Sequence, residues 1–445
     1  MSSIDITRSR LRALAETARQ ADPHRVVGKL ASVTGLIARG TVPGVRVGEL
    51  CMIHSPHRDE PVTAEVVGFE RGEVLLMPLT DIQAVGPDSE IEPTGRVLEV
   101  AVGPRLLGRV VDALGEPIDG GASLDDAPRR AVVADPPAPL TRQRIASRAP
   151  LHTGVRVIDA TLTMGEGQRV GIFSAAGVGK STLLGMIARN VEADAVVIAL
   201  IGERGREVRE FIEDNLAARG LERAVVVVST SDQSALLRVK AGYVAATVAE
   251  SFRDEGKRVV FMMDSITRFA RALREVGLAA GEPPSRQGYP PSVFSTLPRL
   301  IERAGNDAHG SITAFYNVLV EGNDMSEPVA DEVMSLLDGH IVLSREIAAR
   351  GLYPPVDLLF PSVSRLADQV TTPSHRDAAR KLVAALALYE SKRDLITLGA
   401  YQRGADPKLD HAIAKVDAIT EFRRQQPDES AAFDRTVERL EAMFR

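Results

Sequence analysis

The sequence contains no tryptophan, one cysteine and only 4% aromatic residues in a chain of 445. The single thiol, Cys51, cannot form an intrachain disulfide, which agrees with a reducing cytoplasm, and we expect it to be a small strand residue. No run of about 18 apolar residues occurs, and the N-terminus lacks the continuous apolar core of a secretory signal. We therefore expect a cytoplasmic chain that does not span a membrane.

A basic excess is also missing from the sequence. The formal net charge is -6, and the charged residues, 26% of the chain, carry both signs. Phe69 is the only aromatic residue among residues 1–100, so this part of the chain provides little for stacking on bases. Nucleic acid is therefore not an expected partner.

The length exceeds the size of a single hydrophobic core, so we expect two or three domains. Residues 1–24 place Ile4, Leu11 and Leu14 near one helical face, with arginines around them. This segment is either a solvated terminus or a helix that docks on a partner or an anionic surface. Residues 25–95 contain short apolar segments separated by Gly, Pro and Asp, a pattern typical of a small all-β domain, here assigned as a β-barrel.

The middle of the chain alternates apolar runs of strand length with helical segments. These runs are rich in β-branched residues and do not alternate with polar residues, which indicates strands buried on both faces of a parallel sheet. They are Val170–Phe173, Ala195–Ile201, Ala224–Ser229, Val259–Met263 and Ile312–Tyr316. After Thr371 the strand signals stop, and three helical stretches predict a C-terminal helical domain over residues 371–445.

A glycine-rich turn joins the first of these strands to a helix. In a phosphate-binding loop, backbone N–H groups and the helix N-terminus cradle phosphates, the lysine reaches the β and γ phosphates, and the hydroxyl ligates Mg²⁺. Ser174 replaces the first glycine of the general pattern, but the strand before and the helix after it restore the match. We predict an ATP-binding loop in an α/β, RecA-like ATPase domain over residues 96–370. Its binding residues are Ala176, Gly177, Val178, Gly179, Lys180, Ser181 and Thr182.

Two further carboxylates follow buried strands. Asp264 ends the strand Val259–Met263, and alone it would most often be a cap or turn residue. Paired with the P-loop, it is the expected metal partner opposite Ser181. Glu203 lies at the carboxyl end of another strand, where a carboxylate can position or deprotonate a water, and Arg204 can reach a γ-phosphate. The other reading of this charged turn is a helix cap held by salt bridges.

Four motifs carry a family resemblance that covers nearly the whole chain: Gly202–Glu207, Asp264–Arg268, Gly281–Phe294 and Asp338–Arg345. They resemble the type III secretion system ATPases, of injectisome or flagellar export type, which are similar to the β subunit of the rotary ATP synthases. The glycine-rich segment Gly108–Gly120 resembles the same superfamily.

The resemblance implies a role at each matching position. Glu203 matches the catalytic glutamate, and Lys180 and Ser181 match the phosphate and metal residues. Arg204 and Arg268 match arginines that support the γ-phosphate site. Tyr353 matches an aromatic residue that stacks on adenine, although a core tyrosine remains the other reading.

Arg365 matches an arginine finger that a neighbouring subunit inserts against the γ-phosphate, so family catalysis needs an oligomer. An arginine suits this role because its planar fork stabilises the phosphoryl charge of the transition state. The segment Asp357–Ser362 is one residue longer than the family pattern. This departure affects the expected reach of Arg365.

The resemblance also implies partners. They are a homohexameric ring, a stator-like regulator at residues 1–24, a central stalk protein, chaperone–substrate complexes and an export gate at the inner membrane. The expected function is ATP hydrolysis that energises type III protein export, with chaperone release and substrate unfolding, at the cytoplasmic side of the inner membrane. The segment Met325–Asp338 favours the injectisome over the flagellar branch.

Two other functions share the nucleotide-binding core. A non-catalytic nucleotide-binding subunit of a rotary-type ring can lose either Lys180 or Glu203, and this chain has both. A ring translocase on RNA needs stacking aromatics and a basic groove in its N-terminal domain, which this sequence provides poorly.

Overall fold

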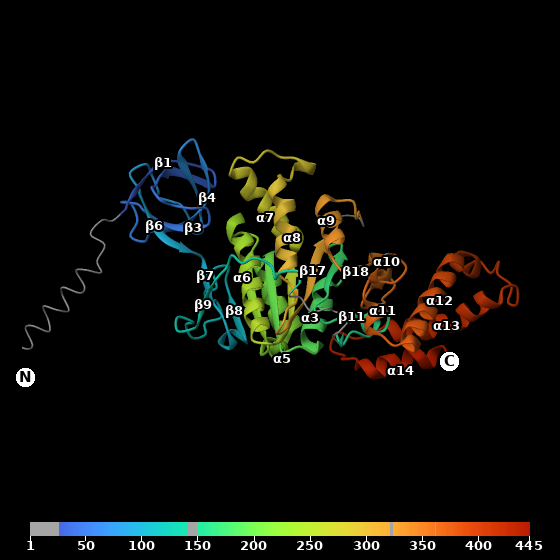
Figure 1. The fold of residues 1–445 in the computed structure, drawn as a ribbon. Coiled ribbons are helices and arrows are strands. Elements are labelled where there is room, and N and C mark those ends of the chain that lie inside the picture. The colour runs from blue at the N-terminus through green and yellow to red at the C-terminus, as the bar shows by residue number, and fades with distance from the viewer. Residues whose placement is uncertain (1–25, 141–148, 321–323, 361) are drawn as a thin grey trace, which may run out of the picture. The chain divides into compact units, whose positions relative to one another are not determined.

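The computed structural model describes residues 26–140, 149–320, 324–360 and 362–445. It divides between Val97 and Leu98 into two compact units (Figure 1). The predicted docking segment, residues 1–24, lies outside the described residues. Among the helices in the described part of the chain, none has the length and apolarity needed to cross a bilayer.

The first unit is a closed barrel of six antiparallel strands in the order β1-β2-β5-β4-β3-β6, with β6 pairing back to β1. The strands are β1 Gly28–Thr34, β2 Ile37–Thr41, β3 Glu49–His54, β4 Val62–Glu70, β5 Glu73–Pro78 and β6 Glu90–Val97. Alternate side chains of β3 point inward, including Cys51 and Ile53. The barrel predicted for the N-terminal part of the chain is confirmed.

The second unit is built on a mainly parallel sheet in the order β19-β18-β12-β17-β15-β13-β14-β8. Every residue of β13 is buried, which explains the uninterrupted apolar run in the sequence. β16 pairs with β17, and β20 pairs with β18. The strands are β8 Arg109–Val111, β12 Arg169–Ser174, β13 Ala195–Glu203, β14 Ala224–Thr230, β15 Arg258–Asp264, β16 Gly305–Asn306, β17 Ser311–Leu319, β18 Gly339–Leu343, β19 Val356–Asp357 and β20 Val363–Ser364.

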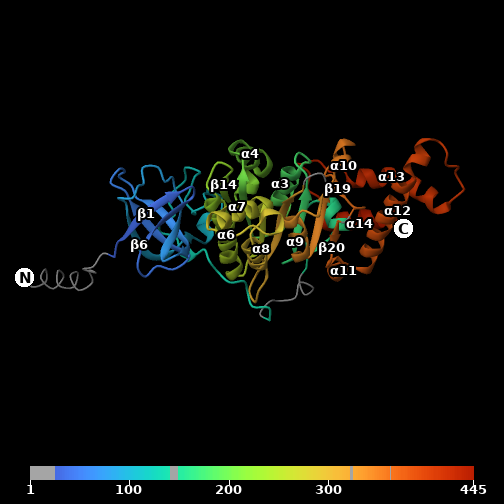
Figure 2. The same cartoon turned by 90° about the horizontal axis from the view of Figure 1, so that it is seen from above.

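Helices cover both faces of this sheet (Figure 2). The chain first steps from β12 through β13 to β14, and then returns through β15 and β17 to β18. Because such crossovers are right-handed, α3, α4 and α5 cover one face and α6 to α9 cover the other. The switch between faces opens a crevice at the carboxyl ends of β12 and β17. The helices are α3 Lys180–Asn190, α4 Gly205–Glu210, α5 Ala217–Leu221, α6 Ala235–Asp254, α7 Ile266–Ala279, α8 Pro291–Glu302 and α9 Pro328–Leu336.

Three helices at the C-terminus pack in the same unit as the sheet: α12 Pro373–Thr397, α13 Pro407–Arg423 and α14 Phe433–Met443. Proline follows the N-cap of α12 and of α13, where the Thr372 and Asp406 side chains accept backbone N–H groups. Leu382, Phe422 and Leu440, one from each helix, belong to the hydrophobic core that also contains α2. The predicted fold class is therefore confirmed, whereas a domain boundary at residue 370 stays a prediction.

Shorter elements connect these parts. They are β7 Glu99–Ala101, η1 Pro104–Leu106, β9 Arg129–Ala131, β10 Pro150–Leu151, α2 Arg156–Thr161, β11 Met164–Gly165, the π-helical turn η3 Phe211–Leu216, η4 Arg286–Gly288, α10 Arg345–Ala349 and α11 Ala367–Val370.

A buried ion pair ties α6 to the residue that follows α8. The Nε and Nη2 atoms of Arg303 each donate to a carboxylate oxygen of Glu250 at 2.7 Å. Arg303 also donates to Val132 O and Thr247 Oγ1, and only 2% of its surface is exposed. Both charges are therefore desolvated, and each depends on the other.

We predict that Glu250→Gln lowers the free energy of unfolding by about 3 kcal/mol, because it leaves the buried guanidinium of Arg303 without its counter-charge. Urea denaturation followed by circular dichroism measures the change. Glu213→Gln, which removes the same charge from an exposed pair with Arg209, is the matched control and should change stability little. Equal losses from the two variants would contradict the prediction.

Candidate active site

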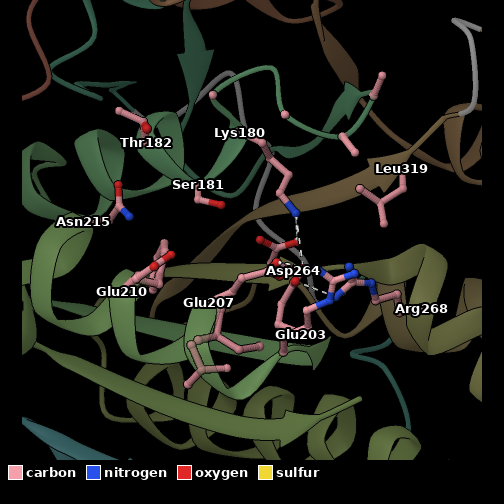
Figure 3. Close-up of a pocket in the computed structure, with 18 residues that line it drawn as sticks. Lys180, Ser181, Thr182, Glu203, Glu207, Glu210, Asn215, Asp264, Arg268 and Leu319 are labelled. Carbon is pink, nitrogen blue, oxygen red and sulfur yellow. Dashed lines mark hydrogen bonds and ion pairs between the residues drawn. The ribbon is translucent and has the colours of Figure 1, made fainter. Parts of the chain in front are cut away.

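A cavity of about 470 Å³ lies where the P-loop meets the carboxyl ends of the sheet strands (Figure 3). Its lining includes residues from the loop after β12, from the end of β13 and from the end of β15. Ten of the predicted site residues line it: Ala176, Gly177, Gly179, Lys180, Ser181, Thr182, Glu203, Arg204, Asp264 and Arg268. One cavity thus brings together residues spread over more than 80 positions of the sequence.

The P-loop conformation depends on its glycines. Gly177 and Gly179 have φ values of 78° and 89°, in the left-handed region that side chains with a Cβ rarely adopt. Gly179 is the N-cap of α3 and brings no side-chain cap, so the first N–H groups of that helix remain available to an anion. Val178 does not line the cavity; it is 2% exposed and packs in the core, where it anchors the loop.

Lys180 connects the loop to both carboxylates. Its Nζ atom lies 2.6 Å from Asp264 Oδ1 and 3.4 Å from Glu203 Oε1. The three side chains are largely buried, so these attractions are only weakly screened by solvent. Lys180 therefore lies beside both acids, in the position from which it can reach a phosphate in the same cavity.

The donor set at this site fits Mg²⁺ bound together with phosphates. The Ser181 hydroxyl and the Asp264 carboxylate line the same cavity, and oxygen ligands are those that Mg²⁺ prefers. Among the described residues, no group of three or more His, Cys, Asp or Glu side chains is arranged to hold a metal ion. A magnesium ion here would therefore take most of its ligands from a nucleotide and from solvent, as it usually does in such enzymes.

Glu203 is held by an arginine on the neighbouring helix α7. Arg268 Nη1 lies 2.6 Å from Glu203 Oε2 and also donates to Gly202 O at 2.6 Å. Arg204 is mostly exposed and pairs with Glu207 at 3.6 Å. Glu203 is thus oriented from one side while its Oε1 atom faces Lys180.

Besides Val178, two predicted residues lie outside this cavity. Tyr353 lines a neighbouring cavity of about 310 Å³, on the other side of Gly179. A Cβ atom added to Gly179 would lie 3.6 Å from the Tyr353 ring, so the ring borders the P-loop directly.

Arg365 is exposed and lines neither cavity. Its backbone N–H donates to Asp338 O at 3.1 Å, at the end of the pairing between β20 and β18. Before it, Asp357 Oδ1 accepts the N–H groups of Leu359 and Phe360 in a turn. The strand pairing and the hydrogen bond to Asp338 O fix the backbone of Arg365.

One residue that the sequence did not point to also shapes the site. Asn317, on β17, is fully buried, and its Nδ2 atom donates to Asp264 Oδ1 at 2.7 Å. The available signal was a polar residue that directly follows the apolar run Ile312–Tyr316. Asn317 holds Asp264 in place independently of Lys180.

Comparison with known proteins gives matches along almost the whole chain. The ATP synthase alpha/beta family models match residues 26–95 with the β-barrel domain and residues 154–364 with the nucleotide-binding domain. The model of the T3SS EscN ATPase C-terminal domain matches residues 371–442.

Individual relatives are similar over nearly their full length. A flagellum-specific ATP synthase of Bacillus subtilis is 48% identical over 97% of this chain and 98% of its own. A type 3 secretion system ATPase of Xanthomonas euvesicatoria is 50% identical over 94% of this chain and 93% of its own. The assembled ATPase EscN of enteropathogenic E. coli superposes with a TM-score of 0.87 and 44% identity, over 94% of this chain and 99% of EscN.

The family models match the two regions in which the structure has a six-stranded barrel and a P-loop cavity. The chain belongs to the ATP synthase alpha/beta family and, within it, to the ATPases of type III secretion and flagellar export.

Proposed function

We propose that this ATPase hydrolyses Mg-ATP in the cavity between Lys180 and Glu203 and uses the energy to drive type III protein export. The observation that carries the proposal is the convergence of Lys180, Asp264 and Glu203 within hydrogen-bonding or ion-pair distance in one cavity. A phosphate-binding loop, a metal partner and a base are the three parts that phosphoryl transfer to water requires.

Each side chain has a distinct task in this proposal. The N-terminus of α3 and Lys180 hold the phosphates, while Ser181 and Asp264 hold the metal ion. Bound Mg²⁺ neutralises charge on the phosphate oxygens during transfer. Glu203 orients the attacking water and accepts its proton, and Arg268 keeps the carboxylate in position.

The site is completed by a second copy of the chain. Arg365 lies away from the phosphate cavity of its own chain, as a group that acts on a neighbour's nucleotide must. The solved relative EscN is described as an assembled ATPase, and also in complex with its central stalk EscO. We therefore propose a homohexameric ring with a central stalk protein, in which Arg365 contacts the γ-phosphate of the adjacent subunit.

The other proposed partners are those that the family resemblance implies. They are a stator-like regulator at residues 1–24, chaperone–substrate complexes and the export gate, with the ring at the cytoplasmic side of the inner membrane. The segment Met325–Asp338 remains the reason to prefer the injectisome, and relatives from both branches match at 48% and 50% identity. ATP hydrolysis would supply the energy for releasing chaperones and unfolding the exported substrates.

We predict that Glu203→Gln lowers kcat for ATP by about 10² to 10⁴, because the amide cannot accept a proton from the attacking water. Binding of ATP, measured by calorimetry, should persist because the P-loop is unchanged. Lys180→Ala is the contrasting variant and should weaken binding as well as turnover. A Glu203→Gln protein that turns over ATP at the parent rate would exclude this glutamate as the base.

We predict that Arg365→Ala lowers the rate of hydrolysis by roughly 10³ without weakening nucleotide binding, since the finger stabilises charge in the transition state of the neighbouring site. Arg380→Ala, at an exposed arginine of α12, is the matched control and should retain activity. Specific activity of the parent should rise with protein concentration as rings form.

Mixing two inactive variants tests whether the finger acts between subunits. In a mixed ring of Glu203→Gln and Arg365→Ala subunits, some interfaces combine an intact Glu203 with an intact Arg365. The mixture should therefore regain part of the parent activity. A mixture that stays as inactive as its components, despite forming rings, would show that Arg365 does not act in trans.

A further inference from the structure

The cavity beside Tyr353 has walls from three distant parts of the chain. Helix α3 provides Thr182 and Met186, the loop after α10 provides Tyr353, and the connection between α13 and α14 provides residues 424–427. The last wall belongs to the C-terminal helices, and Gln426 and Pro427 within it are exposed. Something must hold this connection against the P-loop helix if the cavity is to keep its shape.

Gln425 is the residue that holds it. Gln425 is 2% exposed, and its backbone N–H donates to Tyr353 O at 2.9 Å. The side-chain Oε1 atom accepts the N–H of Arg156 at 2.7 Å, and Nε2 donates to Gly154 O and Glu429 O at 2.8 Å each. One buried side chain therefore joins the α13–α14 connection to the start of α2. It also bonds to Glu429, further along the same connection.

Two arginines support the same connection. Arg156 donates to the carbonyl groups of Phe422 and Arg424 at 3.1 and 2.8 Å, and it pairs with Glu429. Arg189, near the end of α3, donates to Pro427 O. The carbonyl groups of Arg424 and Pro427 in the connection are thus bound by donors from α2 and α3.

We propose that Gln425 is a positioning residue for the nucleobase: it fixes residues 424–427 beside Tyr353, so that the C-terminal helices form the outer wall of the base site. The inference rests on the proposed function, in which phosphates occupy the P-loop cavity and the base enters the neighbouring one. Gln425 acts through the wall that it holds, since its own amide is fully engaged with backbone groups.

This role of Gln425 affects binding of the nucleobase and leaves binding of the phosphates unchanged. The Gln425 side chain bonds to Gly154, Arg156 and Glu429, none of which lines the P-loop cavity. Loss of its hydrogen bonds would free the wall near Tyr353 but would not move Lys180 or the N-terminus of α3. Loss of these hydrogen bonds should therefore weaken the binding of a ligand that has a nucleobase, but not the binding of a ligand that has none.

The experiment compares ADP with inorganic pyrophosphate, both titrated by calorimetry in the presence of Mg²⁺. Gln425→Met keeps the length of the side chain but removes its three hydrogen bonds. We expect its Kd for ADP to rise about tenfold, while the Kd for pyrophosphate changes less than about twofold. In ATP hydrolysis, KM should rise by a similar factor while kcat changes little.

Two further variants separate this role from a general loss of stability. Gln402→Met, at an exposed glutamine between α12 and α13, is the matched control and should bind both ligands like the parent. Arg189→Met removes the bond to Pro427 O and a positive charge near Asp428, both on the same connection, so it should weaken ADP binding in the same selective way but by a smaller factor.

Equal weakening of ADP and pyrophosphate by Gln425→Met would mean that the residue has only a structural role, and unchanged binding of both would mean that it does not position the wall. Either result overturns the inference while leaving the proposed ATPase mechanism intact. A parent protein that binds neither ligand would instead contradict the proposed function itself.

Discussion

The arrangement of the site depends on the position of one ammonium group between two carboxylates at the end of a parallel sheet. Lys180 follows β12, whereas Asp264 and Glu203 end β15 and β13. Parallel pairing brings Leu200 opposite Asp264, so β13 extends three residues further before it reaches Glu203. The strand register therefore sets the separation of the two acids, and Lys180 lies within reach of both. A one-residue slip in that register would turn one acid to the opposite face of the sheet.

Charge balance then explains why a nucleotide needs more than Lys180. In the cavity Lys180 and Arg268 are offset by Glu203 and Asp264, so these four side chains carry no net charge. Arg204, Glu207 and Glu210 also line the cavity, so a triphosphate brings several negative charges to a site with no excess of positive charge. In the proposed mechanism, the uncapped N-terminus of α3 and a magnesium ion would supply the additional positive potential. The hydrogen bond from Asn317 would keep Asp264 in place if Lys180 turned from the carboxylate to a phosphate.

The sequence predicted those parts whose chemistry is local. Gly177, Gly179 and Lys180 are required by the loop itself, and buried β-branched runs identify the central strands. Within the barrel, β2 and β6 have weak sequence signals, because β2 is short and contains Arg and Gly, and β6 has a proline, a glycine and few apolar residues. The roles of Asn317 and Gln425 could not be predicted, since their partners lie 53 and up to 271 residues away. Such roles depend on tertiary packing and leave no pattern in the neighbouring residues.

One segment links the two cavities and the proposed ring contact. Between Gly339 and Arg365 the chain forms β18 beside the P-loop strand β12, then borders the base cavity at Tyr353, and returns as β19 and β20 on the same β18. Tyr353 and Arg365 are therefore attached to one strand, which pairs directly with the strand that leads into the P-loop. If nucleotide binding moved Tyr353, the movement would be transmitted to β18, the strand with which the segment before Arg365 pairs. In the proposed ring, this connection would couple the nucleotide sites of adjacent subunits, because the proposed finger of each subunit would contact its neighbour's nucleotide.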